Sequence, residues 1–165
     1  MLQGRDATHD NVLAALPGHR VAHFACHGIS DWDDPGRSRL LLHDHLANPL
    51  TVGEISRQHL AGADLAYLSA CSTTDTSPRL ADEAVHITAA FQLAGYRNVI
   101  GTLWPVNDAA ATQVAEDFYR YLTSEGTQPP DTGAAALGLH RAVRRLRSKY
   151  PELPSHWAAH IHTGI

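Results

Sequence analysis

The 165-residue chain has only two cysteines, Cys26 and Cys71, and it contains no long apolar run. Two cysteines are too few for a disulfide framework, so each thiol is expected to be buried, catalytic or redox-active. No apolar stretch reaches the roughly 18 residues of a membrane span, and the first residues lack the apolar core of a signal peptide. These absences predict a cytoplasmic protein that makes no membrane contact.

An excess of positive charge is also missing. The chain has 13 Lys and Arg against 17 Asp and Glu, which leaves a net charge of −4. This balance gives no general attraction to nucleic acid, and we expect no nucleic-acid partner. Five basic residues lie between Arg141 and Lys149, and most such helix faces are simply solvated. We expect one domain over residues 1–165.

Apolar residues recur in two periods along the chain. Helical spacing is found in residues 80–94, 111–122 and 139–150, and two shorter helices are expected after Thr8 and Thr51, whose side chains can cap them. Short apolar runs predict strands at residues 21–26, 40–42, 65–70, 99–104 and 157–162, the second of them at a sheet edge. Such alternation predicts an α/β fold, with a mainly parallel sheet covered by helices on both faces.

Two of the predicted strands end in reactive residues. His27 follows the strand 21–26, and Cys71 follows the strand 65–70. The carboxyl ends of parallel strands meet at one edge of a sheet, which is where open α/β sheets place their ligands. Neighbouring strands would therefore bring His27 and Cys71 within reach of each other, although they are 44 positions apart in the sequence.

This pairing suits nucleophilic catalysis. A cysteine attacks as the thiolate, and a nearby imidazole can take the thiol proton and later protonate a leaving amine. Gly28 would let a substrate backbone approach, and the backbone amides of Gly28 and Cys71 are candidate oxyanion donors. The pattern alone leaves an alternative open, in which Cys71 is a small core residue and His27 a structural histidine.

Several motifs resemble those of one family, the CHAT domains. The motifs are His23-Phe24-Ala25-Cys26-His27-Gly28, Leu68-Ser69-Ala70-Cys71-Ser72-Thr73, and Gly101-Thr102-Leu103-Trp104-Pro105-Val106 followed by Asp108. They occur in the family's order and span nearly the whole chain. The resemblance implies a three-layer α/β/α fold of the caspase type.

CHAT domains are grouped with caspases and separases among the cysteine peptidases. The resemblance implies that His27 is the general base and acid, that Cys71 is the nucleophile, and that the substrate is a protein or peptide. It places Asp108 near the pocket that receives a basic side chain in related enzymes. Asp31, in the loop after His27, and Ser72, next to Cys71, are further candidate substrate-binding residues. The resemblance implies no cofactor, a bacterial conflict or regulatory system, and a possible partner chain or upstream repeat or nucleotide-binding modules. Family members normally have further strands before this segment, so the edge of the strand 21–26 is expected to be open.

The remaining candidates have competing interpretations. Cys26 neighbours His27 in an extended chain, where successive side chains point to opposite faces, so we interpret it as a core residue. Asp108 can cap the helix that follows it, or it can receive a basic side chain of the substrate before the cleaved bond. Asp31 can add negative charge near His27 or simply belong to a solvated loop. The paired histidines at 43, 45, 160 and 162 lack the spacing of a metal site, and we expect no metal.

Two other functions remain as alternatives to a peptidase. The domain can be a non-catalytic interaction or regulatory module, or Cys71 can serve a redox or acyl-transfer reaction.

Overall fold

A computed structural model describes residues 1–29, 31, 33–69 and 80–165, with the side chains of residues 80–85 left out. Its helices are α1 (His9–Ala15), α2 (Val52–Ser56), α3 (Leu80–Ala94), α4 (Asp108–Leu122), α5 (Ala135–Lys149) and α6 (Pro154–Trp157). Its strands are β1 (Val21–Phe24), β2 (His27–Ile29), β3 (Arg39–Leu41), β4 (Leu50–Thr51), β5 (Leu65–Leu68), β6 (Asn98–Thr102) and β7 (His160–Gly164).

A four-stranded sheet forms the centre, with the strand order β1-β5-β6-β7. The first three strands are parallel, and β7 runs antiparallel to β6. The predicted mainly parallel sheet is therefore confirmed. β1 lies at one edge, and within the described residues its second edge pairs with no strand.

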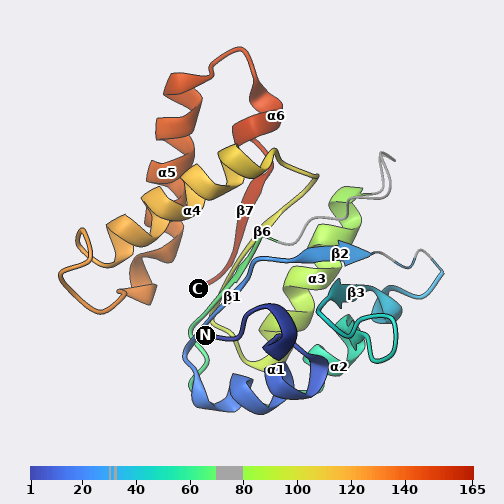
Figure 1. The fold of residues 1–165 in the computed structure, drawn as a ribbon. Helices are drawn as coiled ribbons and strands as arrows, with labels where there is room; N and C mark the ends of the chain where they lie inside the picture. Colours follow the sequence, from blue (N-terminus) through green and yellow to red (C-terminus); the bar gives the residue numbers. More distant parts are fainter. Residues whose placement is uncertain (30, 32, 70–79) are drawn as a thin grey trace.

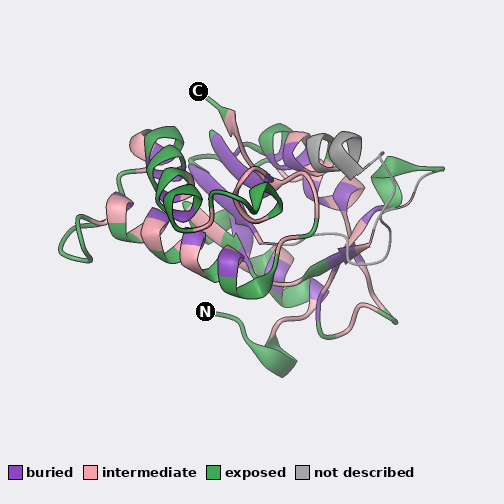
Figure 2. Cartoon of the chain, turned by 90° about the horizontal axis from the view of Figure 1, so that it is seen from above, coloured by how far each residue is buried: buried purple, intermediate pink, exposed green. Residues whose placement is uncertain are grey.

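Helices cover both faces of this sheet, as Figure 1 shows. α1 and α3 pack on one face, and α4 and α5 pack on the other. β5 and β6 are buried between these layers, where purple strands appear in Figure 2, whereas the edge strands β1 and β7 are only partly covered. Side chains alternate along β5, because Ala66 and Leu68 join the core under α3 while Leu65 and Tyr67 join the core under α4.

Local sequence signals explain where several helices begin and end. The Thr8 side chain accepts a hydrogen bond from the Asn11 amide at the start of α1. Thr51 and Glu54 form the predicted capping box of α2. α3 ends directly before Gly95, whose φ of 122° suits glycine, and a Cβ there would lie 2.6 Å from the Leu60 carbonyl oxygen.

The strand predicted at residues 40–42 is present as β3, but the prediction that it lies at a sheet edge is wrong. We expected an edge strand, whereas β3 lies between β2 and β4 in a separate three-stranded antiparallel sheet. The reason is burial, because Leu40 and Leu50 are fully covered and pack with Ile55 of α2. The expected strand 21–26 also ends early, at Phe24. His27 then begins β2 of this second sheet.

Candidate active site

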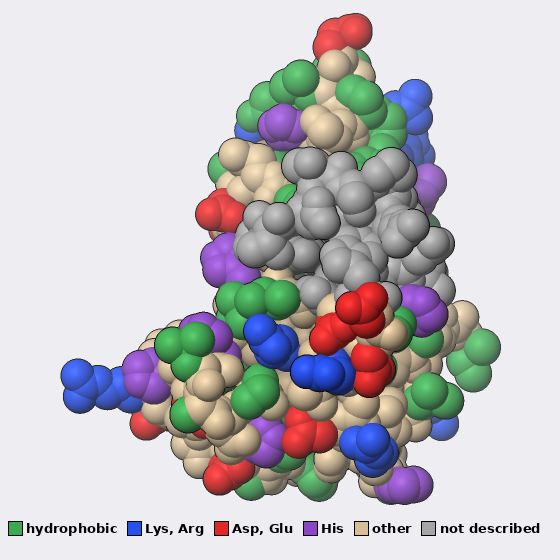
Figure 3. All heavy atoms as spheres, turned by 90° about the vertical axis from the view of Figure 1, so that its right-hand side faces the viewer, with side chains coloured by type: hydrophobic (Ala, Val, Ile, Leu, Met, Phe, Trp, Pro, Cys, Tyr) green, Lys and Arg blue, Asp and Glu red, His purple; other side chains and the backbone are tan. Residues whose placement is uncertain are grey.

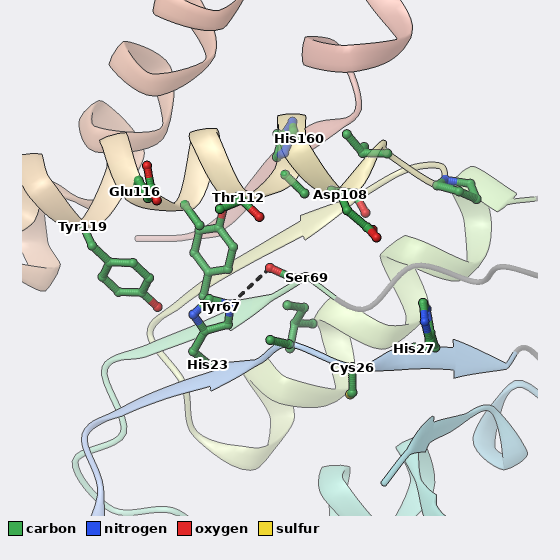
Figure 4. A pocket seen from close by; sticks show the side chains of 17 residues that line it. His23, Cys26, His27, Tyr67, Ser69, Asp108, Thr112, Glu116, Tyr119 and His160 are labelled. Carbon is green, nitrogen blue, oxygen red and sulfur yellow. Dashed lines mark hydrogen bonds between the residues drawn. The ribbon is translucent and has the colours of Figure 1, made fainter. Parts of the chain in front are cut away.

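A pocket of about 650 Å³ opens at the carboxyl ends of β1, β5 and β6, against α4. Its described lining comes from segments far apart in the sequence, and Figure 4 shows how they converge. The polar lining residues are His23, His27, Tyr67, Ser69, Thr102, Asp108, Thr112, Glu116, Tyr119 and His160. The described lining includes two carboxylates and no Lys or Arg, so this part of the pocket favours positively charged ligands.

His27 lies on the rim of this pocket. It is the first residue of β2, where it pairs with Leu41 across the β2–β3 hairpin, and its side chain is exposed. The chain leaves the central sheet after Phe24, so His27 is held by the second sheet and not by β1. An exposed imidazole beside a pocket can exchange protons with both a bound substrate and water.

Cys26 is a poor candidate for a nucleophile. Its side chain packs against the core that contains α1 and α3, and Figure 4 shows it on the opposite side of the chain from His27. Burial raises the pKa of the Cys26 thiol to about 11, so the thiol stays protonated at neutral pH. Cys26 is nevertheless only half-buried and also lines the pocket, so it is a residue at the border of the core.

Asp108 lines the pocket from the first turn of α4. The helix is capped by its neighbour, because the Asn107 Oδ1 accepts hydrogen bonds from the amides of Ala109 at 3.0 Å and Ala110 at 3.4 Å. The Asp108 side chain is therefore not needed as the cap. It is exposed, which leaves its carboxylate available to a ligand.

Asp31 is not among the residues that line the pocket. Its Oδ1 accepts hydrogen bonds from the amides of Asp33 at 3.2 Å and Asp34 at 3.0 Å, and its Oδ2 lies 3.5 Å from the Nε of Arg37. Figure 3 shows acidic and basic side chains intermingled on this side of the molecule. The Asp31 carboxylate thus organises its own loop, and Arg37 offsets its charge.

The other predicted site residues fall into two groups. Cys71 and Ser72 lie outside the described residues. In the sequence, Cys71 follows the last residue of β5 by three positions. Gly28 is buried in β2 opposite Leu40, and a Cβ on it would meet the described residues only at an ordinary 3.7 Å contact with the Arg39 carbonyl oxygen.

Several lining residues were not predicted from the sequence. Glu116 lies eight residues after Asp108, which is just over two helical turns and therefore the same side of α4. That spacing was a usable signal. His160 comes from the far strand β7, and burial lowers its pKa, so its ring is neutral at neutral pH. Nothing local in the sequence distinguishes it among 12 histidines.

The described residues show neither a metal-binding cluster nor a membrane-spanning helix. No cluster of three or more His, Cys, Asp or Glu side chains within the described ranges has the arrangement of a metal site. No helix in the part of the chain that the structure describes combines the length and apolar character needed to cross a membrane.

The fold and the pocket define an α/β domain with a ligand-sized pocket, lined by apolar and polar side chains, at the carboxyl edge of a mainly parallel sheet. A family model described as "CHAT domain" matches residues 1–165. The chain therefore belongs to the CHAT domain family, whose fold is related to that of the caspase-like cysteine peptidases. No curated protein matches the chain.

Proposed function

We propose that this CHAT domain is a cysteine endopeptidase in which His27 and Cys71 form the catalytic pair. The observation that carries the proposal is the pocket at the carboxyl ends of β1 and β5, which has the exposed His27 on its rim. β5 leads in sequence directly towards Cys71, and parallel strands end at a common edge. Cys26 is half-buried and packs against the core, and burial raises the pKa of its thiol to about 11, which favours Cys71 as the nucleophile although Cys26 also lines the pocket.

The reaction follows from the chemistry of such a pair. His27 takes the Cys71 proton, and the thiolate attacks the carbonyl carbon of the scissile peptide bond. The C–N bond then breaks, His27 gives its proton to the leaving amine, and a thioester remains on Cys71. Water, activated by His27, cleaves the thioester and restores the thiol. The amides of Gly28 and Cys71 are the proposed donors to the oxyanion, and Ser72 is a proposed substrate contact.

Asp108 is the proposed determinant of specificity for Arg or Lys before the cleaved bond. Its carboxylate is exposed to the pocket, and Asn107 already caps α4. Glu116 adds a second negative charge to the same cavity, and no described lining residue is Lys or Arg. A guanidinium or ammonium group entering this pocket would meet acceptors without a competing cation. Asp31, by contrast, is engaged in its own loop.

The test compares two cysteine variants on a fluorogenic peptide library and with an activity-based thiol probe. Cys71→Ala should abolish both hydrolysis and labelling, while the matched control Cys26→Ala should keep most of both. Equal loss in the two variants, or full activity in Cys71→Ala, would exclude the proposed catalytic pair.

A non-catalytic assembly module is the second candidate, and the edge of β1 favours it. Within the described residues, β1 pairs only with β5, so its other edge can accept a strand from a partner chain. A bacterial conflict or regulatory system and a cytoplasmic location remain proposals that rest on the family resemblance and the composition. An absence of labelling at Cys71, together with a concentration-dependent molecular mass, would favour this candidate.

A further inference from the structure

One polar contact inside the pocket has no role in the proposed chemistry. The Nε2 of His23 lies 3.1 Å from the Oγ of Ser69, and Figure 4 shows this hydrogen bond crossing from β1 towards the end of β5. Both side chains line the pocket. His23 pairs with Tyr67 in the sheet register, so Ser69 is its diagonal neighbour on the same face.

Aromatic rings hold the His23 side chain in place. The Tyr67 ring lies at a centroid distance of 4.8 Å, and the Tyr119 ring stacks at 5.6 Å with an interplanar angle of 26°. Tyr119 belongs to α4, so the imidazole is fixed by the sheet and the helix together. Burial lowers the pKa of His23, which favours the neutral ring. A neutral imidazole has one acceptor nitrogen, and the Ser69 hydroxyl can donate to it.

Ser69 is thus anchored twice to β1. Its backbone amide donates to the Phe24 carbonyl oxygen at 3.0 Å, which extends the ladder one residue beyond the end of β5. Its side chain is bonded to His23. Cys71 follows Ser69 by two positions in the sequence, so the direction in which the chain leaves Ser69 affects where the thiol can lie.

We propose that His23 and Ser69 form a positioning pair for the nucleophile. His23 acts through Ser69 and exchanges no proton with the substrate. This inference rests on the proposed function, because it assigns the pair to the cysteine of the same site.

A double-mutant cycle tests the pair in the full chain. His23→Phe keeps an aromatic ring against the tyrosines and removes Nε2, while Ser69→Ala removes the hydroxyl. Each change should lower kcat about tenfold with little change in KM, and the double variant should lose no more than either single one. Ser69→Thr, which keeps the hydroxyl, should restore most of kcat. Ser148→Ala, on the exposed surface of α5, is the control for loss of a hydroxyl outside the pocket.

The outcomes separate this inference from the proposed function. Residual hydrolysis in Cys71→Ala would overturn the catalytic pair itself, and the positioning role would fall with it. If Cys71→Ala is inactive, additive losses of about a hundredfold in the double variant, or losses in KM alone, would overturn only the positioning pair. If the wild type cleaves no peptide, the same cycle is measured as the alkylation rate of Cys71 against pH in a Cys26→Ala background. Equal, non-additive shifts of that profile support the pair, and unchanged profiles refute it.

Discussion

Asp108→Asn is the change that tests the proposed specificity most directly. The substitution removes one negative charge from the pocket and alters almost nothing else. Asn107 keeps its bonds to the Ala109 and Ala110 amides, so the cap of α4 survives. The lost interaction with the helix dipole costs about 0.3–1 kcal/mol, which predicts a melting temperature lower by about 1–4 °C.

The effect on selectivity should be larger. A hydrogen bond to a charged group contributes about 1.5–3 kcal/mol. Asp108 is exposed on an open pocket, so we take the lower value, about 1.5 kcal/mol, which corresponds to roughly a tenfold change. The ratio of kcat/KM for Arg over Leu before the cleaved bond should fall by about that factor in the variant. Salt should weaken the preference of the wild type more than that of the variant, which keeps only the charge of Glu116.

The assay uses a peptide library varied at the residue before the cleaved bond. Glu116→Gln removes the same charge two helical turns away, and Glu152→Gln removes one from an exposed position outside the pocket. A loss confined to Asp108→Asn indicates a direct ion pair, whereas equal losses in the first two variants indicate a general field. If the wild type prefers an apolar residue, or if Asp108→Asn keeps its full Arg preference, the reasoning is wrong.

Three further predictions concern the catalytic base, the core and pH. His27→Ala should abolish hydrolysis but leave the melting temperature within about 2 °C of the wild type, because an exposed side chain contributes little to stability. A large shift of the melting temperature would show that His27 is structural. Phe91→Ala should lower the free energy of unfolding, measured in urea, by about 3–5 kcal/mol, because Phe91 is fully buried. Leu93→Ala on the same helix should lower it by less than about 0.5 kcal/mol, because the Leu93 side chain is 75% exposed. Equal losses in the two variants would contradict the packing. Hydrogen bonds to the Asp10 carboxylate, and then to the Glu54 carboxylate, raise the pKa of His9 above 6.5. The protonated His9 ring therefore stabilises the fold fully below pH 6.5, and this stabilisation is lost as the pH rises through the raised pKa. The melting temperature of His9→Asn should therefore fall further below that of the wild type at pH 5.5 than at pH 8.5, and a constant difference would refute this.

Much of the fold was predictable because its signals are local. Helix α4 shows its apolar positions at the helical period, and Gly95 terminates α3 as expected. The β2–β3 hairpin was not predictable in the same way. β2 has only three residues, and the burial of Leu40 depends on α2 and β4, which are tertiary neighbours. A short apolar run flanked by polar loops therefore gave no sign of its central position.

In the candidate site too, features with local sequence signals were predictable and features that depend on tertiary neighbours were not. The placement of His27 and Asp108 beside the pocket was predictable, because each comes a few residues after the carboxyl end of a parallel strand, while their roles remain proposals. The hydrogen bond between His23 and Ser69 was not, because it depends on the register of β1 against β5. A shift of one residue in that register would move His23 away from Ser69. The continuous apolar run of β5 does not by itself fix its register against β1.

The described groups of the site belong to three different elements of the fold. His27 belongs to the small antiparallel sheet, Asp108 to the first turn of α4, and Ser69 to the central sheet. The small sheet is joined to the rest through the buried side chain of Leu40, which packs in the same core as Phe24 of β1. The position of His27 relative to Ser69 therefore depends on core packing beneath β3 as much as on the central strands.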